Sequence, residues 1–331
     1  MLTVMNYKES EKILKEIEKA KKILVNCHRG PDADSVGSAL ALSMALKSMD
    51  KDVSVICPSD VPADLNFLNG ADQIKRVNFS TFDFLSYDLF LVIDSSTYAM
   101  VTGLKDSDKP SIDTIVIDHH ISNERFGKIN LIDAEITSTG ELLYKVFEDW
   151  GISPNKEMGE CLLTGIIGDT GSFQYQNVGE GTLRIAASLM DLGADKDKII
   201  YNIYRNIDFK EVKMWGKFIE SMKIEDNFVW SAIPLSTYKD FGEYPYAKED
   251  AANLFFPIVK GTDFGIVMVE TNDGVLSVSF RSRSGFDVSK IAQEVGGGGH
   301  KAAAGARIEG LLFELAVDKV LTAARKYAKK S

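Results

Sequence analysis

Short apolar runs alternate with longer amphipathic stretches along the first 190 residues of the chain. Four of these runs are short enough to be buried strands and are rich in aliphatic and aromatic residues, at 22–27, 52–57, 87–94 and 113–118. The stretches between and after them predict helices at 34–49, 138–151, 156–167 and 181–193, preceded by an amphipathic helix around Ile13, Leu14 and Ile17. Strands that alternate with helices indicate an α/β fold with a mostly parallel sheet flanked by helices.

The pattern changes after residue 190, which predicts a second, smaller domain. Residues 191–226 combine helical periodicity with mixed charge, as in a helical connector. Further on, the segment "FGIVMVETNDGVLSVSFRSRS" predicts a strand, a turn and a strand, and in its second half Val275, Ser277 and Ser279 alternate with Leu276, Val278 and Phe280. We therefore expect an N-terminal α/β domain at 1–190, a helical linker at 191–226 and a smaller mixed α/β domain at 227–331.

Composition and charge exclude several classes of protein. The chain has 38 Lys and Arg residues and 48 Asp and Glu residues. The resulting net charge of −10 argues against binding of long duplex nucleic acid. No apolar stretch is long enough to span a membrane and the first residues are charged, so we expect a cytoplasmic protein without a membrane partner. The three cysteines are isolated, which argues against a disulfide framework and against a zinc knuckle.

Acidic and imidazole side chains follow the predicted strands. They are His28, Asp32 and Asp34 after the first strand, Asp94 after the third, and Asp118, His119 and His120 after the fourth. Asp169 follows an apolar helical stretch that we expect to break at Gly168. Because the carboxyl ends of parallel strands open at one edge of a sheet, we expect all these groups to lie together there.

Carboxylates packed together repel one another unless a cation neutralises them, so the cluster predicts divalent metal ions. Oxygen and imidazole ligands without a thiolate favour Mn²⁺, with Mg²⁺ as the second choice. Two such ions about 3.5–4 Å apart would activate a water for attack on phosphorus. A single Asp after a strand is usually a helix cap, and a single His is usually structural. All four histidines of the chain, however, lie in strand-terminal or glycine-rich loops, and this joint pattern favours a metal centre.

The motifs resemble a known family. "HRGPDADS", the aspartate of "LVID", "DHH" and the aspartate of "GIIGDT" resemble the four successive motifs of the DHH phosphoesterase superfamily, and "GGGGHKAAAG" resembles its DHHA1 domain. The resemblance implies that His28, Asp32 and Asp94 hold one ion. It implies that Asp34, Asp94, His119 and Asp169 hold a second ion, so that Asp94 bridges the two.

The same resemblance implies catalytic roles for Asp94, Asp118 and His120. His120 would face the substrate phosphate or leaving group, and Asp118 would support the loop. One departure concerns "DSSTYAMVTG", which lacks the Arg that relatives commonly carry beyond Asp94. Any phosphate contact made by that Arg is therefore in doubt here.

The second domain carries candidate substrate-binding residues. Arg281 and Arg283 are two positions apart on a predicted strand end and form a candidate phosphate clamp. The backbone N–H groups of Gly297, Gly298 and Gly299 can approach a phosphate closely, and we expect His300 to close the pocket. A glycine run taken alone is equally compatible with a flexible turn and with a phosphate-binding loop.

Within the superfamily, the arrangement resembles the nano-RNase and pAp-phosphatase group. The resemblance implies a manganese-dependent enzyme that hydrolyses short RNA or DNA oligonucleotides, or 3′-phosphoadenosine 5′-phosphate (pAp), and a homodimer is compatible with it. A cyclic di-AMP or pApA phosphodiesterase is the alternative within the family. A nucleotide sensor without turnover is the alternative from another class, but such a sensor would lack ligands, and none is missing from these motifs.

Overall fold

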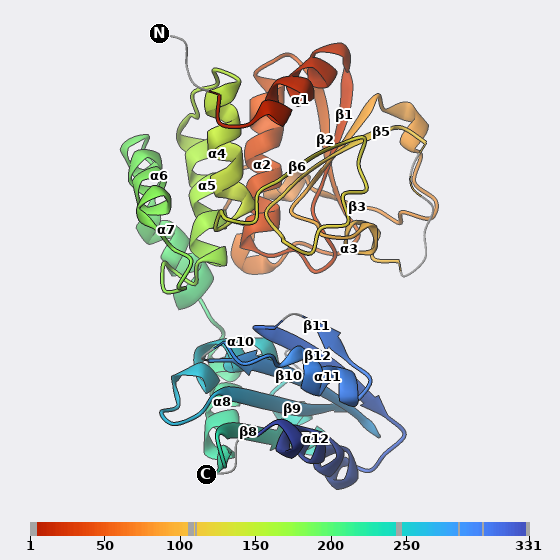
Figure 1. Ribbon diagram of the computed structural model, residues 1–331, viewed down its shortest axis with the longest axis vertical. Coiled ribbons are helices and arrows are strands. Elements are labelled where there is room, and N and C mark those ends of the chain that lie inside the picture. The colour runs from red at the N-terminus through yellow and green to blue at the C-terminus, as the bar shows by residue number, and fades with distance from the viewer. Residues whose placement is uncertain are drawn as a thin grey trace. The chain divides into compact units, whose positions relative to one another are not determined.

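The computed structural model describes residues 5–104, 109, 111–242, 247–283, 285–299 and 301–328. The chain divides into two compact units, Met1–Asn206 and Ile207–Ser331, and the boundary between them falls inside the predicted connector (Figure 1). Among the described residues, no helix has both the length and the apolar composition needed to cross a membrane.

Unit 1 is built on a six-stranded sheet in which every pair of neighbours is parallel, in the order β3-β2-β1-β4-β5-β6. The strands are β1 (Lys22–Asn26), β2 (Asp52–Cys57), β3 (Lys75–Arg76), β4 (Leu89–Ile93), β5 (Asp113–Asp118) and β6 (Ile129–Ile132). The four predicted strands and the parallel sheet are confirmed. The pattern did not predict β3 and β6, since β3 has only two residues and β6 only four.

Helices cover one face of this sheet, and a short helix with an aromatic cluster covers the other. The helices of unit 1 are α1 (Lys8–Lys19), α2 (Ala33–Lys47), α3 (Tyr98–Thr102), α4 (Thr139–Asp149), α5 (Lys156–Asp169), α6 (Glu180–Asp191) and α7 (Lys196–Ile200). Figure 1 shows α2, α4 and α5 side by side, and their apolar residues share one buried core with Val25, Leu91 and Ile117 of the sheet. On the opposite face, α3 packs with Phe79 and Phe90.

Glycines let the helices of unit 1 approach very closely. A Cβ atom at Gly37 of α2 would lie 2.3 Å from the carbonyl oxygen of Cys161 in α5. A Cβ atom at Gly165 of α5 would lie 2.3 Å from Oδ1 of Asp34. The contact between α2 and α5 therefore depends on the missing side chains, and it places Asp34 inside the helix bundle.

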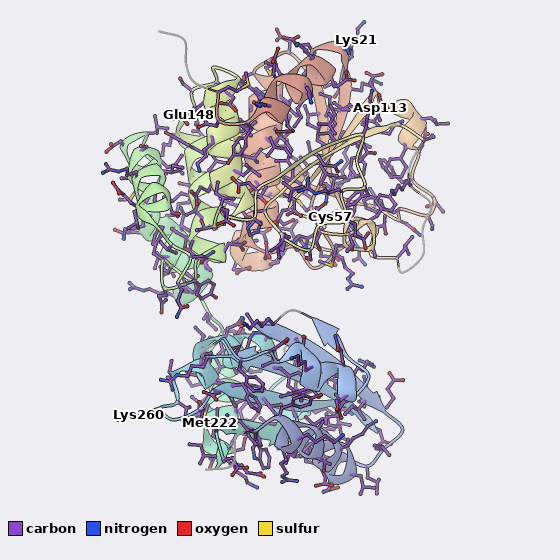
Figure 2. All side chains as sticks on the ribbon, viewed as in Figure 1. Lys21, Cys57, Asp113, Glu148, Met222 and Lys260 are labelled. Carbon is purple, nitrogen blue, oxygen red and sulfur yellow. The ribbon has the colours of Figure 1, made fainter. Side chains whose placement is uncertain are left out.

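The carboxyl ends of the strands lie at one edge of the sheet. Lys21 precedes β1 and Asp113 begins β5, and in Figure 2 both lie toward the same end of unit 1. Cys57, the last residue of β2, lies toward the other end. The loops after β1, β4 and β5 therefore start from a common edge.

Unit 2 contains a mixed sheet in the order β11-β12-β10-β9-β8-β7. Its strands are β7 (Lys223–Glu225), β8 (Phe228–Ile233), β9 (Phe264–Asn272), β10 (Val275–Ser282), β11 (Gly298–Gly299) and β12 (Ala303–Glu309). The predicted strand-turn-strand is confirmed as the β9–β10 hairpin, closed by Asp273 and Gly274 with Gly274 at φ 67°. Among the described strands of this sheet, β8 and β9 pair in parallel and the other neighbours pair in antiparallel orientation.

Helices cover both faces of this second sheet. They are α8 (Phe209–Glu220), α9 (Leu235–Asp240), α10 (Ala247–Leu254), α11 (Ser289–Glu294) and α12 (Phe313–Tyr327). Residues of α8 and α10 share one buried cluster with Val267, whereas α11 and α12 pack on Met268 from the other side. Residues 191–226 are helical at α7, at a π-helix (Tyr201–Arg205) and at α8, but they end in strand β7.

Candidate metal centre

The predicted ligands come from three loops at the common sheet edge and from one helix end. His28 follows β1, Asp94 follows β4, and His119 and His120 follow β5. Asp32 and Asp34 lie at the start of α2. The predicted break at Gly168 is wrong, because α5 continues to Asp169. Gly168 is tolerated inside the helix because α2 lies so close that a Cβ atom there would sit 2.6 Å from Cβ of Ala33.

Asp94 lies at the centre of the cluster. Its Oδ2 atom is 3.5 Å from Nε2 of His28, and its Oδ1 atom is 3.6 Å from Nε2 of His119. The side chain is only 2% exposed, and the Thr139 hydroxyl donates a hydrogen bond of 3.1 Å to Oδ1. The backbone of Asp94 is left-handed, with φ 50°, a conformation that Asp and Asn adopt more readily than most residues. The two oxygens of one carboxylate thus face two different histidines.

His28, Asp32 and Asp94 form the first group of candidate ligands. Nε2 of His28 is 3.6 Å from Oδ2 of Asp32, while its Nδ1 lies 3.1 Å from the carbonyl oxygen of Arg29. When Nδ1 carries the proton for that contact, Nε2 is left with a lone pair that faces the carboxylates. Oδ1 of Asp32 caps α2 by accepting from the backbone N–H groups of Asp34 and Ser35. Asp32 therefore caps the helix with one oxygen and faces His28 with the other.

Asp34, His119 and Asp169 form the second group, and one ligand atom from each lies within 4.8 Å of the others. Nε2 of His119 is 3.1 Å from Oδ2 of Asp169. Asp34 is fully buried and accepts from the N–H groups of Thr139 (2.6 Å) and Gly140 (2.8 Å) at the start of α4. The positive end of this helix offsets part of the negative charge.

His120 differs from His119 in exposure and in partners. Its side chain is 38% exposed, and its Nδ1 lies 2.7 Å from Oδ1 of the buried Asp118. The Asn123 amide donates to Oδ2 of Asp118 (2.6 Å) and to the carbonyl oxygen of Ser95 (3.0 Å). Asp118 is therefore held on both oxygens, and it can orient the imidazole of His120.

Sequence reasoning missed two residues of this centre, Thr139 and Asn123. Thr139 begins the predicted helix at 138–151, so its N–H group is one of the unpaired donors that any helix start provides. The sequence therefore indicated an unpaired donor at this position, but it did not indicate that Asp34 would accept from it. Nothing in the spacing of Asn123 indicated its contact with Asp118.

Burial and like charge shift the pKa values of the cluster in the metal-free protein. Burial, followed by the charges of Asp94 and Asp169, raises the pKa of Asp34 well above its usual value. Burial alone would lower the pKa of His119, but the contact with Asp169 and the neighbouring carboxylates raise it to about 10. Burial also raises the pKa of Asp169, to about 6. In the metal-free protein, protonation of these side chains thus offsets the negative charge of the clustered carboxylates.

The side chains fit a divalent metal ion. Nε2 of His119 is buried and makes no hydrogen bond to any described residue, although it faces the oxygens of Asp94 and Asp169. A buried nitrogen without a hydrogen bond, surrounded by carboxylates, is the arrangement expected of a metal ligand. The donors are oxygen and imidazole nitrogen, which suit hard or borderline ions.

The predicted substrate-binding residues lie in unit 2. Nε of Arg281 donates to Oδ1 of Asn253 (2.6 Å), and Nη1 of Arg283 donates to the carbonyl oxygen of Thr262 (3.3 Å). The N–H group of Gly297 donates to Ala292 (2.7 Å), so in this structure it bonds within the protein.

Gly298 and Gly299 form strand β11, which pairs with β12. A Cβ atom at Gly299 would lie 2.5 Å from Cα of Ala304, which explains a glycine at that position. His300 lies outside the described residues.

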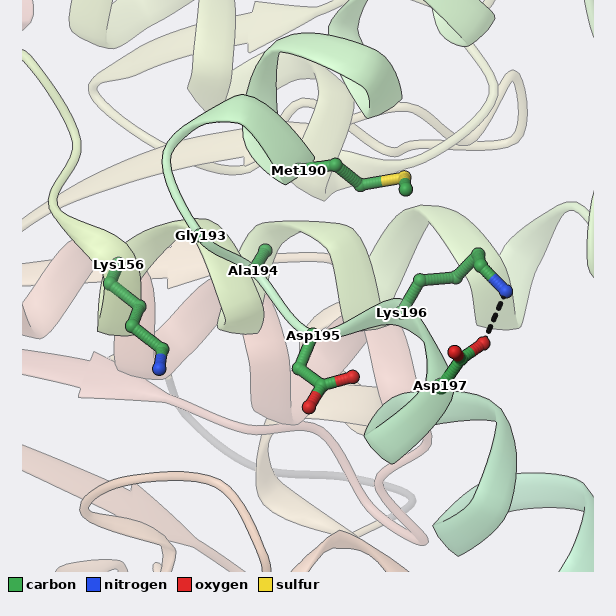
Figure 3. A pocket seen from close by; sticks show the side chains of 7 residues that line it. All are labelled: Lys156, Met190, Gly193, Ala194, Asp195, Lys196 and Asp197. Atoms are coloured by element: carbon green, nitrogen blue, oxygen red, sulfur yellow. Dashed lines mark hydrogen bonds and ion pairs between the residues drawn. The ribbon is translucent and has the colours of Figure 1, made fainter.

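One surface pocket of unit 1 lies elsewhere. It has a volume of about 330 Å³ and is lined by Lys156, Met190 and residues 193–197. Figure 3 shows the Lys196–Asp197 ion pair on its wall. The pocket contains none of the predicted site residues, so it does not bear on the metal centre.

Comparison with known protein families agrees with the motifs. The DHH family, N-terminal domain, matches residues 22–166, and the DHHA1 domain matches residues 259–330. The chain belongs to the DHH/DHHA1 phosphoesterase superfamily. The resemblance based on the motifs is confirmed, and the chain is a hydrolase that acts on phosphoester bonds.

Several proteins are similar to this chain over nearly its whole length. The bifunctional oligoribonuclease and PAP phosphatase NrnA of Thermus thermophilus is 29% identical, over 97% of this chain and 95% of its own. The cyclic-di-AMP phosphodiesterase PdeA of Listeria monocytogenes is 24% identical over 97% of this chain but only 50% of its own. The crystal structure of an exopolyphosphatase-related protein from Bacteroides fragilis superposes with a TM-score of 0.90 at 27% identity, covering 99% of this chain and 98% of that one.

Proposed function

We propose that the protein is a manganese-dependent enzyme that hydrolyses short oligonucleotides and pAp with two bound divalent ions. The observation that carries this proposal is the Asp94 carboxylate, whose Oδ2 atom lies 3.5 Å from Nε2 of His28 and whose Oδ1 atom lies 3.6 Å from Nε2 of His119. A carboxylate shared between two ligand groups suits a pair of ions. The match to NrnA over nearly its full length supports this choice of substrates.

Each of the two ions would have its own set of ligands, with Asp94 common to both. His28, Asp32 and Asp94 would hold one ion, and Asp34, Asp94, His119 and Asp169 the other. When bound, such ions lower the pKa of a coordinated water and stabilise negative charge on phosphate oxygens. His120, oriented by Asp118 through its Nδ1, would hold a proton on Nε2 for the leaving oxygen.

The proposal assigns substrate binding to unit 2. Arg281 and Arg283 would bind substrate phosphate, together with the segment from Gly297 to His300. An Arg281→Ala variant should raise KM for pApA while kcat stays within about twofold, because it removes a binding contact and leaves the metal centre intact. A kcat that falls while KM is unchanged would contradict this assignment.

The central test compares substrates and variants. Purified protein with Mn²⁺ is incubated with pAp, pApA and cyclic di-AMP, and the release of phosphate and AMP is measured. We expect release from pAp and pApA. Asp94→Asn keeps the size and backbone preference of Asp94 but removes its charge, so it should lose turnover and Mn²⁺ binding together. The control is Asp113→Asn, because Asp113 is an exposed residue at the opposite end of β5.

The second candidate function is hydrolysis of cyclic di-AMP. The similarity to PdeA favours it, although the chain spans only half of that relative. Faster turnover of cyclic di-AMP than of pAp and pApA would replace the first proposal with this one. Nucleotide binding without release of phosphate or AMP from any substrate would indicate a sensor. Normal Mn²⁺ binding by Asp94→Asn would contradict the bridging role.

A further inference from the structure

The loop that follows Asp169 is built tightly around the next residue. The carbonyl oxygen of Thr170 accepts from the N–H groups of Gln174 (2.9 Å) and Tyr175 (3.2 Å). The hydroxyl of Thr170 accepts from the N–H group of Phe173 (2.9 Å) and donates to the carbonyl oxygen of Ile166 (2.6 Å) in α5. The positions of residues 173–175 are therefore fixed relative to the end of α5, where Asp169 lies.

The backbone of this loop is strained. Gly171, Ser172 and Phe173 have φ values of 54°, 59° and 66°, so three consecutive residues are left-handed. Only glycine adopts this conformation readily, and a bulky residue such as Phe rarely does. Strain of this kind persists where the surrounding structure imposes it, and it is frequent at ligand sites.

Tyr175 is the aromatic residue that this loop presents to solvent. It is 55% exposed, and its ring lies so close to Gly171 that a Cβ atom there would be 2.6 Å from Cε1. The backbone N–H group of Tyr175 donates to the carbonyl oxygen of Thr170, which is the residue directly after Asp169. The exposed ring therefore belongs to a residue whose backbone is hydrogen-bonded to the neighbour of a candidate metal ligand.

The neighbours of Tyr175 are polar and exposed. Gln174, Gln176 and Asn177 all lie at the surface. The amide nitrogen of Gln174 donates to the carbonyl oxygen of Gly171 (2.6 Å). The amides of Gln176 and Asn177 offer both donors and acceptors, as the edge of a nucleobase requires. An aromatic ring with amides around it combines the two interactions that proteins use on unpaired bases, stacking on the face and hydrogen bonds at the edge.

We propose that Tyr175 stacks on the nucleobase of the nucleotide whose phosphate lies at the metal centre. The identification of the ligand as a nucleotide rests on the function proposed above. Every base has a π face, so a stacking contact accepts different bases. Recognition of the base in general would then lie in unit 1, on the loop that follows Asp169.

The test measures binding and does not depend on turnover. AMP and ribose 5-phosphate both carry a ribose and a 5′-phosphate, but only AMP carries a base. Their affinities are measured by calorimetry in the presence of Mn²⁺. The wild-type protein should bind AMP about tenfold more tightly than ribose 5-phosphate. Tyr175→Ala should remove this preference, and Tyr175→Phe, which keeps the ring, should retain it.

Two results would overturn the inference. One is equal binding of AMP and ribose 5-phosphate by the wild-type protein, and the other is an unchanged preference in Tyr175→Ala. Circular dichroism verifies folding, and Tyr175→Leu, which keeps bulk without an aromatic ring, replaces the alanine variant if that variant does not fold. An intact preference for AMP in a protein that hydrolyses neither pAp nor pApA would defeat the proposed function but not the base contact.

Discussion

At the scale of single residues, the metal centre shows how one loop residue serves two purposes. Asp32 caps α2 with Oδ1 and faces His28 with Oδ2. The sequence predicted the candidate ligands because each follows a strand or ends a helix at a common edge. It could not predict Thr139, because its hydrogen bond reaches Asp94, which lies 45 positions away in the chain. It could not predict Asn123, because the contact with Asp118 depends on how the loop after β5 folds back, which the spacing of these residues does not indicate.

Thr139 provides a first prediction. Its hydroxyl donates to Asp94, while its N–H group donates to Asp34. Thr139→Val removes only the hydroxyl and should weaken Mn²⁺ binding about tenfold, since groups that orient metal ligands typically contribute that much. Calorimetric titration with Mn²⁺ measures this, and Thr139→Ser, which keeps the hydroxyl, is the matched control. Equal affinities of the Val and Ser variants would show that the hydrogen bond does not position Asp94.

Asn123 provides a second prediction. Asn123→Ala removes the donor that holds Oδ2 of Asp118, so His120 loses part of its orientation. We expect kcat on pApA to fall roughly tenfold or more while Mn²⁺ affinity is unchanged, because a general acid contributes at least that much. Asn130→Ala is the control, since the Asn130 side chain, on β6, exchanges hydrogen bonds with the backbone of Gly127 and with no residue of the candidate metal centre among those described. A loss of Mn²⁺ binding in Asn123→Ala would instead indicate a structural role.

The pKa of His119 predicts how the stability of the metal-free protein depends on pH. The pKa is about 10 in the folded protein and 6.5 for an ordinary histidine, so folding favours the protonated form. This contribution is complete below pH 6.5 and is lost as the pH rises toward 10. Burial raises the pKa of Asp169 from 3.8 to about 6, so this group adds a further loss of stability as the pH rises from 3.8 to about 6. The free energy of unfolding in EDTA should therefore decrease from pH 5 to pH 9 in urea titrations.

His119→Gln tests the cause of this decrease. The variant lacks the titrating group, so its stability should change less with pH above 6.5 than that of the wild type. Identical slopes in the two proteins would assign the pH dependence to other groups.

At the scale of helices and strands, the sequence predicted elements well where the apolar pattern is long. β1, β4 and β5 contain continuous apolar runs whose residues are buried on both faces of the sheet, whereas in β2 only the last three residues form such a run. β3 and β6 are too short to form a pattern. The end of α5 was misplaced because Gly168 suggests a break, whereas the close approach of Ala33 in α2 explains that glycine.

The glycines between α2 and α5 allow a prediction at this scale. Gly165→Ala would place a Cβ atom 2.3 Å from Oδ1 of Asp34, so the helices must move apart or Asp34 must shift. We expect a loss of about 1–3 kcal/mol in the free energy of unfolding, together with weaker Mn²⁺ binding. Gly216→Ala in α8 is the matched control, because no atom lies within 4 Å of a Cβ atom there. Urea titration measures both variants, and equal stabilities would show that the interface tolerates a methyl group.

At the scale of the whole molecule, the candidate metal ligands found among the described residues all belong to unit 1. An ion that binds only the folded state adds about 2.7 kcal/mol of stability at a concentration one hundred times its Kd. Mn²⁺ should therefore raise the unfolding temperature of unit 1, and EDTA should lower it again. Calorimetry should show this shift in one transition while the transition of unit 2 stays in place. A shift of both transitions would show that the two units unfold together.

The strand order of unit 1 also determines when its sheet can be completed. β1 lies between β2 and β4, and Ile23 pairs with Leu89, far along the chain, whereas the β9–β10 hairpin of unit 2 closes over a two-residue turn. Pairing between distant segments is slow, and local hairpins form quickly. During synthesis, β1 leaves the ribosome before β4 has been made, so the edge of β1 that pairs with β4 stays unpaired until then. A chaperone that recognises extended apolar segments would therefore find its target in the first strand made, and refolding should be slower for unit 1 than for unit 2.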